Sequence, residues 1–228
     1  MAKEGGNKKP AVSRPQKGAY HHGELPDRLM DLAVGAIEIH GTEALSLRAL
    51  AREAGVSATA PYRHFPSKRC LLAGIATQGF KQLTAKMEGQ LAEIEATSER
   101  FLAMGLAYVE FAVANPVPYN LMFGSVIADF SDYEMLQEAS EECYAQLLKE
   151  LRVLIEEYNL DISDIELGAV VWSGVHGMAS LMINSQRMPD ESSATSLPGQ
   201  SMSTLHQNTE RSMMVMFGHF IDDSSALH

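Results

Sequence analysis

A short stretch of the chain carries side chains whose types and spacing suit contact with a polyanion. Ser57 and Thr59 offer hydroxyl groups that can hydrogen-bond to base edges or to phosphate. Ala58, between them, is small enough to let the backbone approach closely. With the cations, the phenol and the histidine nearby, the set of candidate contact residues is Arg48, Ser57, Ala58, Thr59, Tyr62, Arg63, His64 and Lys68. This set predicts recognition of a nucleic acid through hydrogen bonds and charge.

Two short helices joined by a glycine turn are expected to position these residues. The first begins near Ser46 and has an apolar face made of Leu47, Leu50, Ala51 and Ala54. Gly55 ends it, because glycine adopts positive φ angles at little cost. Ser57 is placed to cap a second helix that runs to about Arg63. Pro61 should keep that helix short or 3₁₀-like, because proline lacks an N–H. This is the outline of a helix-turn-helix, whose second helix enters the DNA major groove.

The rest of the chain also has helical periodicity, without strand-like alternation or an internal repeat. Pro26 and Gly41 bound an expected first helix, and Ser67 caps a long helix that follows the helix-turn-helix. Later helices are expected over about 99–115, 119–123, 132–158, 163–187 and 201–221, with a Pro/Ser-rich loop at 188–200. The sequence therefore predicts an all-α protein with a flexible basic arm (1–23), a three-helix helix-turn-helix domain (24–72) and a C-terminal helical bundle (73–228).

Charge is divided unevenly along the chain. Residues 1–70 hold eleven Lys and Arg against seven Asp and Glu, whereas residues 71–228 hold seven against twenty-two. The two parts thus carry net charges of +4 and −15. This division favours a basic module for a polyanion, joined to an acidic body that points away from it. Chance clustering of solvated charges is the alternative.

Composition also limits the class of protein. No apolar run approaches the roughly 20 residues that a membrane-spanning helix needs, and no apolar stretch follows the basic N-terminus as in a signal peptide. We therefore expect a cytoplasmic protein without a membrane partner. Cys70 and Cys143 are far apart, which favours two free thiols over a disulfide framework or a zinc site. Neither a metal nor a cofactor is expected.

The helix-turn-helix segment resembles the DNA-binding domain of the TetR family of regulators. The resemblance covers about residues 25–72 and rests on Gly55-Val56, Tyr62, His64-Phe65, Pro66-Ser67 and Lys68, in that order and at fixed spacing. It implies that Tyr62 and Lys68 contact phosphate. By the same resemblance, His64 contacts phosphate or packs beneath the helix, and Arg48 reaches phosphate or a base. Ala60-Pro61 replaces a Thr-Leu pair that many members carry, which removes one polar contact.

A shorter resemblance, to the WHG class of TetR-family C-terminal domains, lies in the hexapeptide Trp172-Ser-Gly-Val-His176-Gly177. Small residues recur along this expected helix, and the last expected helix has an apolar face without an obvious partner. Two such helices from each of two subunits would form the four-helix interface of a symmetric homodimer. Such a dimer should read a pseudo-palindrome in double-stranded DNA. The family resemblance further implies an operator-binding regulator, more commonly a repressor, that a small-molecule effector controls.

Methionine and aromatic side chains of the bundle are candidates for the wall of an effector pocket, because such pockets are mainly apolar with a few polar anchors. The candidates are Phe101, Met104, Tyr108, Phe111, Tyr119, Met122, Tyr144, Trp172 and His176, with Cys143 and Met182 as further members. A plain hydrophobic core is the alternative for each of them. For His176, a hydrogen-bonded core histidine is the favoured interpretation.

Two other functions compete with a DNA-binding regulator. An enzyme is not expected, because the sequence lacks the G-x-S-x-G, H-E-x-x-H, P-loop and G-x-G-x-x-G motifs. A helical adaptor that binds only protein would explain the apolar last helix. It would leave the segment Leu45–Leu72 without a role.

Overall fold

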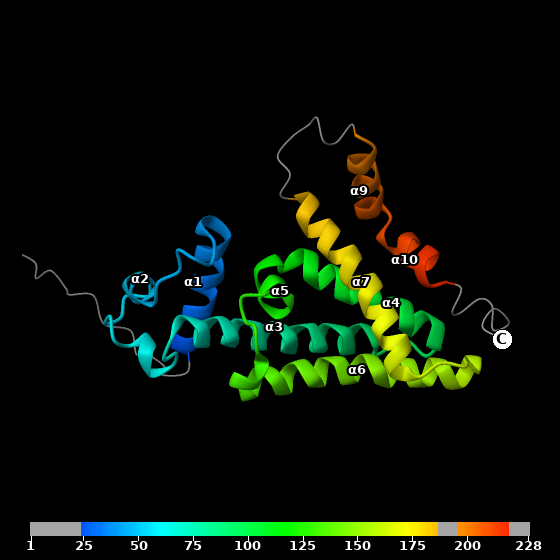
Figure 1. Ribbon diagram of the computed structural model, residues 1–228, viewed down its shortest axis with the longest axis horizontal. Helices are drawn as coiled ribbons and strands as arrows, with labels where there is room; N and C mark the ends of the chain where they lie inside the picture. The colour runs from blue at the N-terminus through cyan, green and yellow to red at the C-terminus, as the bar shows by residue number, and fades with distance from the viewer. Residues whose placement is uncertain (1–23, 187–195, 219–228) are drawn as a thin grey trace, which may run out of the picture.

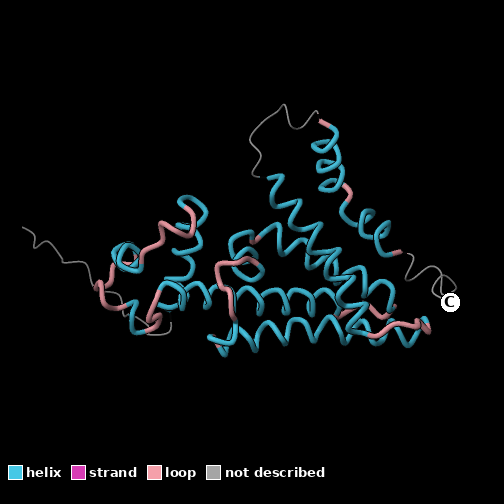
Figure 2. The backbone as a smooth tube through the Cα atoms, viewed as in Figure 1, coloured by secondary structure: helices cyan, strands magenta, loops and turns pink. Residues whose placement is uncertain are grey.

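The computed structural model describes residues 24–186 and 196–218, and within these ranges every regular element is a helix. Figure 2 shows the helices of the described chain joined by short loops. The predicted all-α fold is therefore confirmed. The expected basic arm at 1–23 lies outside the described residues.

The N-terminal unit consists of α1 (Glu24–His40), α2 (Leu47–Glu53) and the 3₁₀ helix η1 (Pro61–Arg63). Gly41 and Gly55 follow α1 and α2 with φ angles of 77° and 71°, a left-handed conformation that glycine adopts at the end of a helix without steric cost. The unit is held together by a small apolar core that includes Leu29, Ala33, Leu45, Leu50, Ala54, Phe65 and Leu71.

The helix α3 (Lys68–Leu91) begins in the N-terminal unit and continues through the body of the protein. Its N-terminus is capped by Ser67, whose Oγ accepts a hydrogen bond from the backbone N–H of Cys70 at 3.1 Å. Figure 1 shows α1 and α2 at one end of α3 and the bundle along the rest of it. Twelve of the 24 residues of α3 are buried, because other helices cover more than one of its sides.

The body packs α4 (Thr97–Ala114), α5 (Pro116–Phe123) and α6 (Glu134–Tyr158) against α3, and α7 (Asp164–Gln186) lies across α4 and α6. A short 3₁₀ helix, η2 (Phe130–Asp132), precedes α6. α5 begins three residues before the predicted Tyr119. Pro116 and Pro118 both fall in its first turn, where no intrahelical N–H bond is required.

An ion pair joins the end of α3 to α4 and α6. The Arg100 guanidinium on α4 donates through Nε and Nη2 to the two carboxylate oxygens of Glu150 on α6, at 2.9 and 2.8 Å. Its Nη1 donates to the carbonyls of Leu91 and Ile94, at 2.8 and 2.9 Å. One side chain therefore satisfies the buried Glu150 and two backbone acceptors at the C-terminal end of α3.

The helix α7 is more apolar than expected from the sequence. An 18-residue window of this helix has a mean hydropathy of 1.2, which by length and composition suffices to cross a membrane. The pair α4 and α5, bent by 109°, also passes this test when the two are taken together. The expectation that no segment approaches spanning length was wrong, because isolated polar residues interrupt the apolar run without lowering its average. In the structure 39% of the α7 window is buried, and the helix packs on α4, α6 and α9 (Leu197–Gln207).

The last expected helix, over 201–221, is in fact two helices, α9 and α10 (Thr209–Phe217). Asn208 separates them with a non-helical conformation, and its side-chain amide donates to the carbonyl of Thr204. α9 starts at Leu197, inside the expected loop, because Ser196 caps it and Pro198 lies in its first turn. α9 packs on α7 and α10 packs on α4, while 219–221 lie outside the described residues.

Candidate nucleic-acid interface and internal cavity

The candidate nucleic-acid contact residues gather at the end of the molecule that carries α2 and η1. Seven of the eight have exposed side chains, namely Arg48, Ser57, Ala58, Thr59, Tyr62, Arg63 and His64. Tyr62 is 44% exposed although it is a large aromatic residue, so its ring is not part of the core. Phe65, in contrast, is buried beneath them. The structure therefore presents these polar groups to solvent, on a base of packed apolar residues.

The segment expected to form a helix from Ser57 to Arg63 is mostly turn. The backbone N–H of Ala60 bonds to the carbonyl of Ser57 at 2.9 Å, and regular 3₁₀ structure is confined to Pro61–Arg63. Pro61 is buried and has no N–H to donate to the preceding turn, so residues 57–64 close i→i+3 bonds, and one α-type bond follows, from the N–H of Phe65 to the carbonyl of Pro61. The predicted boundary was too long, while the expectation of 3₁₀ geometry at Pro61 is confirmed.

Lys68 differs from the other members of the set because its ammonium group already has protein partners. Its Nζ donates to the carbonyl of Thr42 at 2.9 Å and to that of Glu43 at 3.2 Å. These contacts tie the first residue of α3 to the turn between α1 and α2. An ammonium has three N–H groups, so one is left for a ligand such as phosphate.

Cations near η1 are not neutralised by neighbouring carboxylates. Among the residues that the structure describes, the three ion pairs all lie beyond residue 85: Lys86–Glu110, Arg100–Glu150 and Arg152–Asp164. Arg48, Arg52, Arg63 and Arg69 are all exposed. Their positive charge is available to attract the DNA backbone.

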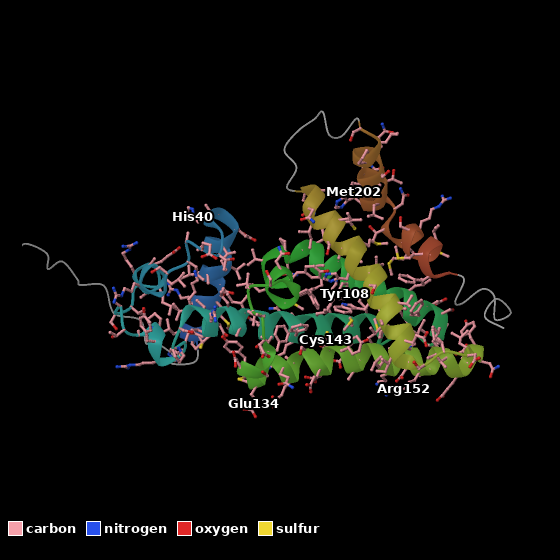
Figure 3. All side chains as sticks on the ribbon, in the orientation of Figure 1. His40, Tyr108, Glu134, Cys143, Arg152 and Met202 are labelled. Atoms are coloured by element: carbon pink, nitrogen blue, oxygen red, sulfur yellow. The ribbon has the colours of Figure 1, made fainter. Side chains whose placement is uncertain are left out.

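A cavity of about 410 Å³ lies within the body. Its wall comes from α3, α4, α5, α6, α7 and α10, with η2 at one side. The lining residues are Phe80, Met87, Phe101, Met104, Gly105, Tyr108, Met122, Phe123, Gly124, Phe130, Ser140, Cys143, Tyr144, Leu147, Val171, Trp172, Val175, Met213 and Phe217. Figure 3 shows Tyr108 and Cys143 in the middle of the bundle, away from the end that carries α1 and α2.

Six of the nine predicted pocket residues line this cavity: Phe101, Met104, Tyr108, Met122, Tyr144 and Trp172. Phe111, Tyr119 and His176 do not. Of the two further candidates, Cys143 is in the wall and Met182 is not. The sequence reasoning missed Phe80, Phe123 and Phe130, and also Met213 and Phe217 on α10. Nothing in their spacing separates a cavity wall from a filled core, since both need the same apolar helix face.

Tyr119 and His176 instead form a hydrogen-bonded network with Tyr108. The Nδ1 atom of His176 lies 2.7 Å from the hydroxyl of Tyr119 and 3.1 Å from that of Tyr108. The rings of Tyr119 and His176 stack with centroids 5.4 Å apart. Burial lowers the pKa of His176 below its ordinary value of 6.5, which favours the neutral imidazole. Burial also raises the pKa of Tyr108 well above 10. His176 is thus half-buried and hydrogen-bonded to two tyrosines, outside the cavity wall.

Both cysteines are free thiols. Cys143 is buried in the cavity wall, and burial raises the pKa of its thiol to about 11, so that the thiol is neutral at pH 7. Cys70 is half-buried near the start of α3 and interacts with the hydroxyl of Ser67 at 3.1 Å. Within 24–186 and 196–218, no group of three or more His, Cys, Asp or Glu side chains could hold a metal ion.

Together, the helix-turn-helix with its exposed cations and the helical body with an internal cavity define a DNA-binding transcriptional regulator. Two family profiles match the chain. Residues 29–75 match "Bacterial regulatory proteins, tetR family", and residues 101–197 match "Tetracyclin repressor-like, C-terminal domain". The protein therefore belongs to the TetR family.

Individual proteins are similar to this chain at moderate identity. A nucleoid occlusion factor, SlmA from Vibrio vulnificus, is 28% identical over 120 residues, which cover 53% of this chain and 60% of that protein. The chain thus spans less than two thirds of such curated relatives. A protein of unknown function from Rhodococcus sp. RHA1 is 28% identical, with a TM-score of 0.66 over 86% of this chain and 98% of the other. The TetR-family regulator PfmR from Thermus thermophilus shares the fold, with a TM-score of 0.56, 24% identity, and coverage of 81% and 98%.

Proposed function

We propose that this protein is a homodimeric repressor that binds a pseudo-palindromic operator and leaves it when a small molecule occupies the cavity. The observation that carries the proposal is the position of α3. Its first residue, Lys68, is bonded to the α1–α2 turn, and Phe80 and Met87 of the same helix line the cavity. A change in the cavity wall can therefore reach the DNA-binding end through one continuous element.

α3 is long enough for a small rotation at the cavity to produce a large displacement at its first residue. At 1.5 Å per residue, Phe80 and Met87 lie roughly 18 and 28 Å along the axis from Lys68. A tilt of about 5° at the cavity would move the start of α3 by roughly 2 Å. Two recognition segments displaced in this way would no longer match successive major grooves. Release also requires that the effector bind the DNA-incompetent arrangement more tightly than the competent one.

We assign the DNA contacts to residues 24–72 and the effector and dimer contacts to 73–228. Ser57, Ala58 and Thr59 face the major groove in this proposal. Tyr62 donates its hydroxyl to a phosphate, and the exposed Arg48, Arg63 and His64 contact the backbone or a base. The role of Lys68 is mainly to position the start of α3, with one N–H left for phosphate.

The dimer interface that we propose is formed by α7, α9 and α10. Large apolar side chains are exposed on these helices: Ile165, Val170, Leu181, Leu197, Met214, Val215 and Met216. Val215 is 80% exposed, and with the exposed Met214 and Met216 beside it in the chain it belongs to a group of apolar side chains of the kind that a partner covers. A two-fold axis through this surface would present two recognition segments to half-sites about 34 Å apart. The apolar surface of α7 is then covered by protein rather than by lipid, and the regulator acts in the cytoplasm.

Selection of DNA from a random pool tests the proposal. The purified protein should enrich a pseudo-palindrome with half-sites about one helical turn apart, and gel-shift titration should give a dimer–DNA complex. The variant Tyr62→Phe, which lacks only the hydroxyl, should weaken binding several-fold by loss of about 1 kcal/mol. The control Tyr158→Phe, at the far end of α6, should bind like the wild type. Failure to enrich any sequence would refute the proposal.

A further inference from the structure

No wall residue of the cavity, within the described part of the chain, has a charged side chain. Two polar side chains of the wall, Ser140 and Tyr108, are already hydrogen-bonded within the protein. Ser140 Oγ donates to the carbonyl of Gln137 at 2.8 Å, and the hydroxyl of Tyr108 belongs to the network with His176. The hydroxyl of Tyr144 lies over Gly168, where an added Cβ would come within 3.0 Å of it.

Among the described residues, every side-chain nitrogen or oxygen that is shielded from both solvent and the cavity has a hydrogen-bond partner within the protein. Within the same residues, the wall also contains no Lys, Arg, His, Asp or Glu that could act as a counter-ion. A site built for a charged ligand would instead keep an unpaired donor, acceptor or counter-ion, because burying an unpaired charge costs several kcal/mol. The cavity therefore offers a ligand apolar and aromatic contacts.

The dimensions of the cavity follow from the spacing of its wall residues. On three helices the outermost lining positions are seven residues apart: Phe80 and Met87 on α3, Phe101 and Tyr108 on α4, and Ser140 and Leu147 on α6. Seven residues of helix extend about 10 Å. A volume of about 410 Å³ lies toward the lower end for sites of drug-sized ligands. The space suits a slender molecule about two helical turns long.

We infer that the effector is an uncharged, mainly apolar molecule about 10 Å long, and that the cavity excludes carboxylates and ammonium ions of the same shape. This inference rests on the proposed function for the identity of the effector site. The cavity opens to solvent where Trp172 is 38% exposed, but an ionised head group deeper inside would have to shed its water against Phe, Met and Val side chains without a counter-ion. It would enter only after neutralisation.

Three probes of matched shape test this inference: 1-decanol, decanoate and decylammonium. Trp172 is the only tryptophan of the chain and lies in the cavity wall, so its fluorescence reports occupancy directly. Decanol should change the emission saturably and raise the melting temperature. At pH 7 only a small fraction of decanoate is protonated, so its apparent affinity should be lower than that of decanol by a factor of about 100 or more. That affinity should rise about tenfold from pH 7 to pH 6, whereas the affinity for decanol should not.

A charge placed at the cavity wall should reverse this selectivity. Ser140 is half-buried on α6, so the long stem of a lysine there can reach solvent. The variant Ser140→Lys should raise the ratio of decanoate affinity to decanol affinity at least tenfold over that of the wild type. Ala145→Lys is the matched control, because it adds the same charge to an exposed position of α6 outside the wall. It should leave both affinities unchanged.

The outcomes separate the inference from the proposed function. Binding of decanoate or decylammonium as tight as that of decanol at pH 7 overturns the inference, as does a lack of any response to saturating decanol. If a charged probe alone binds and releases the operator, the inference fails and the proposed function stands. If decanol binds with the predicted selectivity but operator affinity does not change, the inference stands and effector-controlled release fails.

Discussion

Removal of the Arg100 side chain should destabilise the body of the protein far more than removal of a comparable surface arginine. Glu150 is only 7% exposed and Arg100 is 26% exposed, so the ion pair is largely removed from water. The change Arg100→Ala deletes two hydrogen bonds to the Glu150 carboxylate and two to the carbonyls at the end of α3. The carboxylate would then remain buried without its counter-ion.

The expected magnitude follows from this burial. Loss of one partner of a buried ion pair typically lowers the free energy of unfolding by about 3–5 kcal/mol. Because a quarter of the arginine surface is open to solvent, water can hydrate part of the vacated site, and we expect about 3 kcal/mol. For a chain of this size that corresponds to a fall in melting temperature of roughly 6–12 °C.

Urea unfolding at a fixed protein concentration measures this cost, and the concentration must be fixed because dimer stability depends on it. Arg152→Ala is the control, since its pair with Asp164 is 60% and 24% exposed and should contribute less than about 1 kcal/mol. The double change Arg100→Met with Glu150→Leu should recover most of the loss, because no buried charge remains. Equal costs for Arg100→Ala and Arg152→Ala would refute this reasoning.

Three further predictions concern DNA contact, the cavity and pH. Arg63→Ala should reduce the salt dependence of operator binding by about one released counter-ion. The control Lys149→Ala, also at an exposed position, should leave the slope of log affinity against log salt concentration unchanged. Gel-shift titration over a roughly fourfold range of salt concentration measures both slopes. Gly105→Ala should cost no more than about 1 kcal/mol in urea unfolding, because the new Cβ would lie 2.2 Å from Cε of Met213, the end of a flexible side chain that can move into the cavity. The same change should alter probe affinity, and an unchanged affinity would contradict the role of Met213 in the wall. Burial lowers the pKa of His176, so below pH 6.5 the unfolded chain binds a proton that the folded chain does not. The free energy of unfolding should therefore fall as the pH drops below 6.5, and His176→Gln should flatten this pH dependence.

The helix-turn-helix could be predicted from sequence because its determinants are local. Gly41 and Gly55 are required where φ is positive, and Ser67 caps α3 as expected. The extent of the recognition segment could not be predicted as well. A capped helix and a turn ending at Pro61 satisfy the same local preferences, and the burial of Pro61 favours the turn.

The cavity was predicted only in part, for a physical reason. Phe101 and Phe111 lie on the same helix and are equally buried, yet only Phe101 lines the cavity. Which apolar residue faces empty space depends on how well six helices fill the volume between them, and pairwise patterns do not contain that information. The same limit applies to α10, whose Met213 and Phe217 reach the cavity only because α10 packs on α4.

By itself, the amino-acid sequence determined the helical class, the caps and turns of the N-terminal unit, and the separation of basic and acidic parts, since each depends on residues close together in the chain. Only the tertiary structure decided that Lys68 bonds to the α1–α2 turn, that Arg100 holds the far end of α3, and that His176 lies behind the cavity wall. These contacts join residues between 6 and 68 positions apart, and their geometry follows from helix packing rather than from any local preference.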